Sequence, residues 1–198
     1  MTALAQMCYS IFMKNSQQKR AVAFETLERL KDGNKEYVNA KSNTADVSPE
    51  RRRQTVENGQ HPYAVIVSCS DSRVIPESIF SAGIGDLFVI RVAGNVVDSF
   101  QLGSIEYAVE HLGCRLVVVL GHTHCGAVGA AHGHNCGYVR TITDEIKSAI
   151  GDETDMQKAS ILNVKHSVSK IQSHLQEPDL LVVGALYMTD TGVVKFDI

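Results

Sequence analysis

Unbroken runs of apolar and β-branched residues mark the middle of the chain. The clearest runs are Tyr63–Val67, Leu87–Arg91 and Leu116–Leu120, and such runs are typical of strands that are covered on both faces of a parallel sheet. A longer run, Leu180–Met188, and a short one after a glycine, Val193–Phe196, predict a fourth strand and a hairpin return. The pattern therefore predicts a central, mainly parallel sheet.

Helical periodicity lies before, between and after these runs. Apolar residues recur at helical spacing in the segments 21–40, 101–112 and 156–175. A short polar helix is predicted after Ser48, because this capping residue is followed by Pro49, which suits the first helical position, and then by an acidic residue. The alternation of strands and helices predicts an α/β fold with helices flanking the sheet.

Composition and charge are those of a globular protein. The chain has 198 residues, of which 44% are hydrophobic and 21% charged, and 19 basic against 22 acidic residues give a net charge of −3. This length fits one domain, so we expect a single α/β domain at 21–198 and an N-terminal helical arm or extension at 1–20. Apolar runs are far shorter than the roughly 20 residues of a membrane helix, and a basic stripe for a phosphate backbone is lacking. We therefore expect neither a membrane nor a nucleic-acid partner.

Five cysteines are spread along the chain. An odd number, in a chain long enough to form a core without disulfides, indicates reduced thiols and a reducing compartment such as the cytoplasm. The first 24 residues contain no acidic residue and carry Lys14, Lys19 and Arg20, a bias shared by organelle transit peptides. Import into an organelle therefore stays open. Cys8 and Cys114 are expected to have packing or surface roles.

Residue types that bind metals follow two of the predicted strands. Cys69 follows the first strand, and His122 and Cys125 follow the third, where the chain turns into a helix. Because ligands of α/β proteins bind at the carboxyl ends of parallel strands, we expect these three side chains to converge. Two thiolates and one imidazole suit Zn²⁺ and leave a fourth tetrahedral position free. The joint placement thus predicts a catalytic zinc site, although each residue alone is more typical of an ordinary core position.

Two motifs resemble those of a known family. Cys69-Ser-Asp-Ser-Arg73 and Gly121-His-Thr-His-Cys-Gly126 closely resemble the zinc-binding signatures of the β-class carbonic anhydrases, and the similarity runs from about Phe24 to the C-terminus. The resemblance implies that the three residues above bind Zn²⁺. It also implies that a zinc-bound hydroxide hydrates carbon dioxide reversibly to bicarbonate and a proton, and that the chain forms a homodimer or a dimer of dimers.

The same resemblance makes Asp71 and Arg73 a catalytic dyad. A bidentate pair with the arginine would keep the carboxylate ionised and away from the metal, whereas Asp71 would itself be a metal ligand in a closed, inactive state. His124 is a candidate for carrying the proton to solvent, and other residues stay open for this role. We expect activity to rise toward alkaline pH, because two thiolates cancel the charge of the ion and reduce its effect on bound water.

Two further groups of residues are weaker candidates. Some members of the family have a noncatalytic bicarbonate pocket that uses a tryptophan, an arginine and a tyrosine. The corresponding positions here are Ile66, Arg91 and Tyr187, so inhibition by bicarbonate stays open. The segment His132-Gly-His-Asn-Cys136 holds three ligand-type residues, but its glycine and asparagine are more typical of a solvated loop.

Three other functions are compatible with these residues. The same zinc site in a pocket of different shape could hydrolyse carbonyl sulfide or carbon disulfide. A nonenzymatic zinc-binding protein would use Asp71 as a permanent fourth ligand. A phosphatase or redox enzyme would use Cys69 as a nucleophile, but Arg73 follows too soon for a phosphate-binding cysteine loop. The paired motifs favour the carbonic anhydrase.

Overall fold

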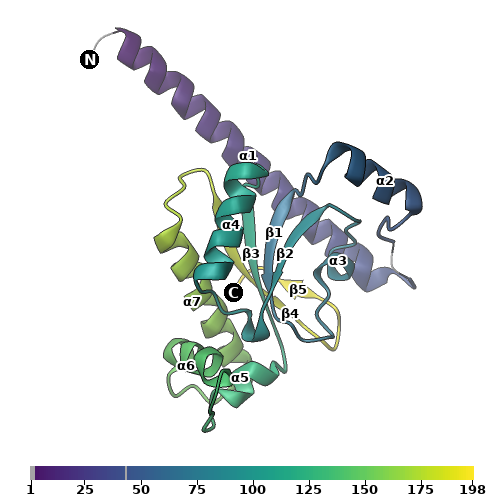
Figure 1. Cartoon of the computed structure of the whole chain (residues 1–198), viewed down its shortest axis with the longest axis vertical. Coiled ribbons are helices and arrows are strands. Elements are labelled where there is room, and N and C mark those ends of the chain that lie inside the picture. Colours follow the sequence, from purple (N-terminus) through teal and green to yellow (C-terminus); the bar gives the residue numbers. More distant parts are fainter. Residues whose placement is uncertain (1–2, 43) are drawn as a thin grey trace.

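A five-stranded sheet in the order β2-β1-β3-β4-β5 forms the centre of the computed structural model (Figure 1). The structure describes the backbone of residues 3–42 and 44–198, and side chains from residue 16 onward within these ranges. The first four strands are parallel, and the last is antiparallel to its neighbour. The mainly parallel sheet is therefore confirmed. The strands are β1 (Ala64–Ser68), β2 (Leu87–Arg91), β3 (Leu116–His122), β4 (Leu181–Tyr187) and β5 (Val194–Lys195).

Helices connect and flank the strands, as the α/β interpretation predicts. The sequence pattern does not predict α3, η1 and α6, whereas α2, α4 and α7 lie close to their predicted bounds. In the described part of the chain, no helix is both long enough and apolar enough to cross a lipid bilayer. The helices are α1 (Ala3–Asn39), α2 (Pro49–Asn58), α3 (Pro76–Ile79), the 3₁₀ turn η1 (Ala93–Asn95), α4 (Ser99–His111), α5 (Gly126–Ala130), α6 (Val139–Ile150) and α7 (Met156–His174).

Helix α1 is much longer than the helix predicted at 21–40. It runs unbroken from Ala3 to Asn39, and its first half projects away from the sheet (Figure 1). The predicted arm at 1–20 therefore shares one helix with the first helix of the domain, and a domain boundary at residue 20 stays a prediction. The second half of α1 packs closely on α3, where a Cβ on Gly33 would lie 2.0 Å from the carbonyl oxygen of Phe80.

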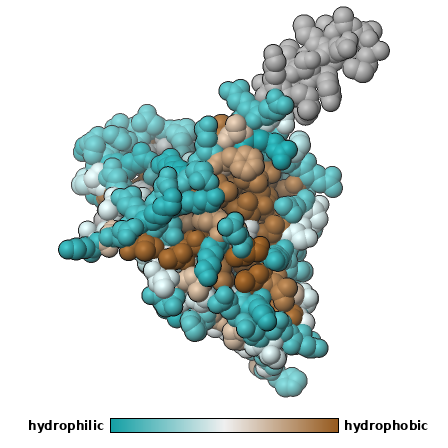
Figure 2. Space-filling view, turned by 180° about the vertical axis from the view of Figure 1, so that it is seen from behind, coloured by the Kyte–Doolittle hydropathy of each residue, from teal (hydrophilic) through white to brown (hydrophobic). Residues whose placement is uncertain are grey.

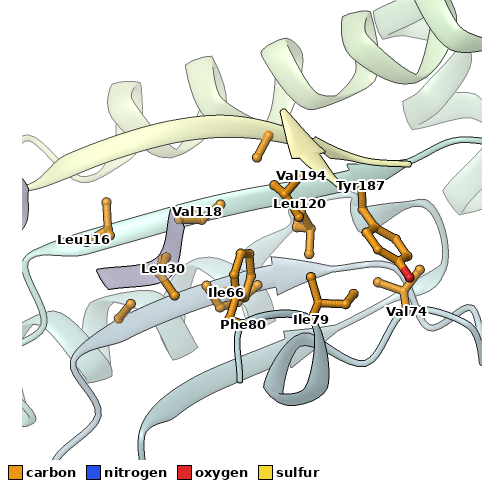
Figure 3. Packing of buried hydrophobic residues seen from close by; sticks show 12 residues of the cluster. Leu30, Ile66, Val74, Ile79, Phe80, Leu116, Val118, Leu120, Tyr187 and Val194 are labelled. Atoms are coloured by element: carbon orange, nitrogen blue, oxygen red, sulfur yellow. The ribbon is translucent and has the colours of Figure 1, made fainter. Parts of the chain in front are cut away.

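Apolar side chains fill both faces of the sheet. On one face, Leu30 of α1 and Ile79 of α3 lie in a cluster with Ile66 of β1 (Figure 3). On the other face, Ile105 of α4 and Val164 of α7 pack with the alternate residues of β1 and β3. Every residue of β3 is buried. Because both faces are covered, the carboxyl ends of β1 and β3 form a rigid frame for the loops that follow them.

Candidate metal centre

The three predicted ligands come together at the carboxyl ends of two paired strands. Cys69 directly follows β1, His122 is the last residue of β3, and Cys125 precedes α5. The parallel register of β1 and β3 brings these strand ends side by side. The two sulfurs and one ring nitrogen all lie within 4.8 Å of one another, and all three residues are buried.

The imidazole of His122 is oriented for binding an ion. Its Nδ1 lies 2.9 Å from the carbonyl oxygen of Thr123. Because a carbonyl oxygen only accepts, Nδ1 carries the proton and Nε2 presents a lone pair. This Nε2 is buried and has no hydrogen-bond partner among the described residues, an arrangement that costs free energy unless a ligand occupies the site.

The donor set and its dimensions fit Zn²⁺. Zinc bonds sulfur at about 2.3 Å and nitrogen at about 2.1 Å, so the ligand atoms of a tetrahedral site lie roughly 3.6–3.8 Å apart. The three ligand atoms here lie within 4.8 Å of one another, so small side-chain movements would bring them to one ion. Two thiol sulfurs and one imidazole nitrogen are also the soft, borderline ligands that this ion prefers. The residues present therefore fit a zinc site with one position left for water or substrate.

The environment of Cys69 favours its thiolate. Interaction with the Cys125 thiol lowers the pKa of Cys69, and the backbone N–H groups of Asp71 and Gly94 lower it further. These N–H groups donate to the Cys69 sulfur at 3.4 Å and 3.2 Å. The same interaction raises the pKa of Cys125, because one proton is shared between the two sulfurs. These contacts thus favour the thiolate form of Cys69, which is the form that binds a divalent cation.

Asp71 and Arg73 form the predicted pair. Arg73 donates from Nε and Nη2 to the two carboxylate oxygens of Asp71, at 2.9 Å and 2.7 Å. Its guanidinium holds the pKa of Asp71 well below the usual range. Arg73 Nη2 also donates to the carbonyl oxygen of His124 at 3.1 Å, so the arginine bridges the two motifs. The Asp71 carboxylate lies outside the three-residue cluster.

Arg91 and Tyr187, at the positions of the noncatalytic bicarbonate pocket, form hydrogen bonds to other groups of the protein. Arg91 donates to the carbonyl oxygens of Cys69 and Asp71, at 3.3 Å and 2.8 Å. The hydroxyl of Tyr187 lies 3.1 Å from the hydroxyl of Tyr37 on α1. Arg91 therefore supports the backbone of the first motif, and Tyr187 ties β4 to α1.

The remaining candidates lie outside the cluster. His124 is exposed beside the ligands and adopts a left-handed backbone with φ of 57°. In the segment 132–136 all residues except Asn135 are exposed, and among the described residues no second group of three metal-ligand side chains has a common centre. Cys114 is buried and donates to the carbonyl oxygen of Pro62. The side chain of Cys8 lies outside the described residues.

Sequence reasoning missed two residues near the cluster, Gly94 and Asn163. Gly94 supplies an N–H to the Cys69 sulfur, and Asn163 of α7 donates to the Gly94 carbonyl oxygen at 2.7 Å. Neither belongs to a ligand-type motif. A contact between a backbone amide and a side chain 25 positions away leaves no trace in the local pattern of the chain.

Comparison with known proteins agrees with this geometry. The sequence model of the carbonic anhydrase family matches residues 64–194. Carbonic anhydrase 2 of Mycobacterium tuberculosis is 37% identical over 181 residues, which cover 82% of this chain and 87% of the relative. The chain belongs to the β-class carbonic anhydrases. The resemblance inferred from the two motifs is thereby confirmed, and the protein is a carbonate dehydratase by family.

Solved β-carbonic anhydrases share its fold. A β-carbonic anhydrase of Aspergillus fumigatus matches with a TM-score of 0.66 at 28% identity, over 74% of this chain and 80% of the other. One of two tetrameric β-carbonic anhydrases from Sordaria macrospora matches with a TM-score of 0.64 at 28% identity, over 74% of this chain and 86% of the other. The α/β prediction is therefore confirmed for most of the chain.

Proposed function

We propose that this β-carbonic anhydrase binds one Zn²⁺ through Cys69, His122 and Cys125 and hydrates carbon dioxide reversibly to bicarbonate and a proton. The observation that carries the proposal is the buried, unpartnered Nε2 of His122 beside two thiols. When bound, zinc supplies a water that is acidic enough to act as a nucleophile near neutral pH, as in the carbonic anhydrases that use three histidines.

The dyad has two tasks in this proposal. The Asp71 carboxylate, held ionised by Arg73, accepts a hydrogen bond from the attacking water and orients its lone pair toward the carbon of the substrate. Arg73 also restrains the carboxylate from turning toward the cluster. Loss of this restraint would let Asp71 become the fourth ligand, which gives the closed, inactive state.

The proposal includes an assembly and a compartment. We place the enzyme in the cytoplasm as a homodimer or a dimer of dimers, with organelle import through the N-terminal extension as the alternative. Relatives from Sordaria macrospora are described as tetrameric. Figure 2 shows an extended apolar area on one face of the molecule, and Val22 and Phe24 of α1 are exposed. Apolar surface of this kind is typical of subunit contacts.

Metal analysis combined with stopped-flow hydration across pH tests the proposal. We expect one zinc per chain, loss of turnover with a chelator, recovery with zinc, and turnover that rises toward alkaline pH. Cys125→Ala should lose both zinc and turnover. Cys114→Ala, which removes an equally buried thiol outside the cluster, should keep both.

The alternative functions give different results in the same assays. Stoichiometric zinc without turnover would favour a nonenzymatic zinc-binding protein. Hydrolysis of carbonyl sulfide or carbon disulfide without hydration of carbon dioxide would favour the hydrolase. A rate that is already independent of pH well below neutrality would contradict the proposed ligand set.

A further inference from the structure

A chain of two hydrogen bonds connects α7 to one of the proposed ligands. The side-chain amide nitrogen of Asn163 donates to the carbonyl oxygen of Gly94 at 2.7 Å. The N–H of Gly94 in turn donates to the sulfur of Cys69 at 3.2 Å. Asn163 is only 1% exposed, so its amide has no solvent to bond instead. We propose that Asn163 is a positioning residue, which fixes the Gly94 peptide and thereby the N–H···S hydrogen bond to Cys69.

The backbone at Gly94 needs such a support. Gly94 and Asn95 have φ of 69° and 46°, in the left-handed region that glycine and asparagine tolerate best. A Cβ on Gly94 would lie 2.6 Å from Cδ1 of Ile146 and 3.1 Å from Cβ of Ala127, so a larger residue would require these side chains to shift. A glycine without contacts would move freely between several conformations. The surrounding side chains must therefore fix the peptide plane that directs the N–H at sulfur.

Two residues of α7 hold this left-handed segment, and each bonds a different carbonyl oxygen of it. Asn163 bonds the carbonyl oxygen of Gly94, whereas Ser167, one helical turn later, bonds the carbonyl oxygen of Asn95 at 3.2 Å. Both side chains are buried. The N–H of Gly94 donates to the Cys69 sulfur, whereas the N–H of Asn95 donates to the carbonyl oxygen of Val92. Ser167 therefore offers a matched control with a similar contribution to folding and no direct path to Cys69.

Asn163 is more than a packing residue of α7. Its amide oxygen is buried and has no hydrogen-bond partner in the described part of the chain. Burial of such a group costs free energy, which packing alone would avoid with an apolar residue. The hydrogen bond that the Asn163 amide donates to the carbonyl oxygen of Gly94 offsets this cost.

The consequence concerns how the site holds its metal, so this inference rests on the zinc site proposed above. A hydrogen bond to a thiolate withdraws charge from sulfur and fixes its direction. Groups that orient metal ligands in this way typically change metal affinity by about 10–100-fold when they are removed. Without Asn163, we expect Cys69 to remain a metal ligand. Its sulfur would be less precisely oriented and more electron-rich, because the hydrogen bond from Gly94 would be weaker.

The experiment compares Asn163→Ala with Ser167→Ala in the full-length protein. The zinc-loaded proteins are mixed with a chromophoric chelator, and the release of zinc is followed by absorbance. We expect release from Asn163→Ala to be about tenfold faster than from wild type and release from Ser167→Ala to be unchanged. In the Co²⁺-loaded proteins, the sulfur-to-cobalt charge-transfer band should move to longer wavelength only in Asn163→Ala, because an electron-rich sulfur gives up charge more easily.

Thermal unfolding of both variants separates metal retention from stability. If Asn163→Ala does not fold, the experiment uses Asn163→Ser. The serine hydroxyl can donate to a carbonyl oxygen of its own helix, so this substitution should destabilise the protein less. Equal release rates and equal bands in the Asn163 variant and wild type would overturn the inference. A Ser167 variant that changes both readouts as much would also overturn it, because loss of stability would then explain the effect. Failure of the wild type to bind one metal per chain would instead overturn the zinc site itself.

Discussion

At the scale of single residues, one arginine controls the charge and direction of the carboxylate beside the cluster. We expect Arg73→Ala to reduce kcat/KM for hydration by roughly a hundredfold, because the carboxylate of Asp71 loses both of its guanidinium hydrogen bonds. Asp71→Asn should have a similar effect. Zinc content should not change in either variant, since neither side chain belongs to the cluster. Stopped-flow assays with metal analysis measure both quantities.

A surface pair supplies the control for this prediction. Arg140 and Asp144 of α6 form an exposed ion pair at 2.9 Å, and such pairs contribute little to stability. Arg140→Ala should therefore keep wild-type turnover. Full activity of Arg73→Ala would show that the dyad does not take part in the reaction.

The thiols should differ strongly in reactivity. Burial raises the pKa of Cys114 to about 11, so at about pH 8 this thiol is protonated and unreactive, and it gains reactivity only as pH approaches its pKa. Cys136 is exposed. We expect iodoacetamide to modify Cys136 at least roughly a hundredfold faster than Cys114, measured by mass spectrometry of peptides. Comparable rates would contradict the buried position of Cys114.

The residues of the site divide into those that the sequence reveals and those that it does not. Cys69, His122 and Cys125 are visible because ligand-type residues follow strands whose ends must lie together in a parallel sheet. The contributions of Gly94 and Asn163 are not visible. A backbone N–H is present at every residue, and only the folded chain shows which one points at sulfur.

At the scale of elements, the sequence pattern predicts the strands more closely than the short helices. The predicted bounds of β2 agree with the structure, because its apolar run begins after a turn at residues 84–86 and ends at Arg91. Strand β3 extends to His122, two residues beyond its apolar run, since pairing with β4 continues to Tyr187. Helix α6 also carries an apolar stripe, with Ile142, Ile146 and Ile150 one turn apart, but polar residues separate these positions.

Two glycines in helices should respond in opposite ways to alanine. Gly33 lies where α1 touches α3, and a Cβ there would lie 2.0 Å from the Phe80 carbonyl oxygen. Gly33→Ala should therefore lower the free energy of unfolding by about 1–3 kcal/mol. Gly103 of α4 is exposed, with nothing within 4 Å of an added Cβ. Gly103→Ala should raise the free energy of unfolding by about 0.5–1 kcal/mol.

Urea denaturation of the two alanine variants under identical conditions measures this difference. The sequence alone predicts the same gain for both, because glycine is a poor helix former wherever a helix is solvated. A stabilised Gly33→Ala protein would mean that α1 and α3 are farther apart than the structure shows.

At the scale of the whole molecule, the projecting half of α1 is the feature that a second subunit would explain. Ser16 and Lys19 still contact Asp179 of the domain, whereas the helix before them extends outward (Figure 1). We expect removal of residues 1–15 to convert the proposed dimer to monomer and to leave zinc content unchanged. Light scattering coupled to size-exclusion chromatography gives the mass. An unchanged mass would exclude this segment from the subunit contact.

The pairing of β1 with β3 also decides when the protein can acquire its metal. Cys69 and His122 are brought together only after the chain between them has been made and both strands have found their register. A nascent chain that ends before residue 122 has only one of the three ligands. We therefore expect the proposed zinc ion to bind after the sheet has formed. Cells starved of the ion should accumulate folded, empty enzyme that becomes active within the time of a binding reaction, without new synthesis.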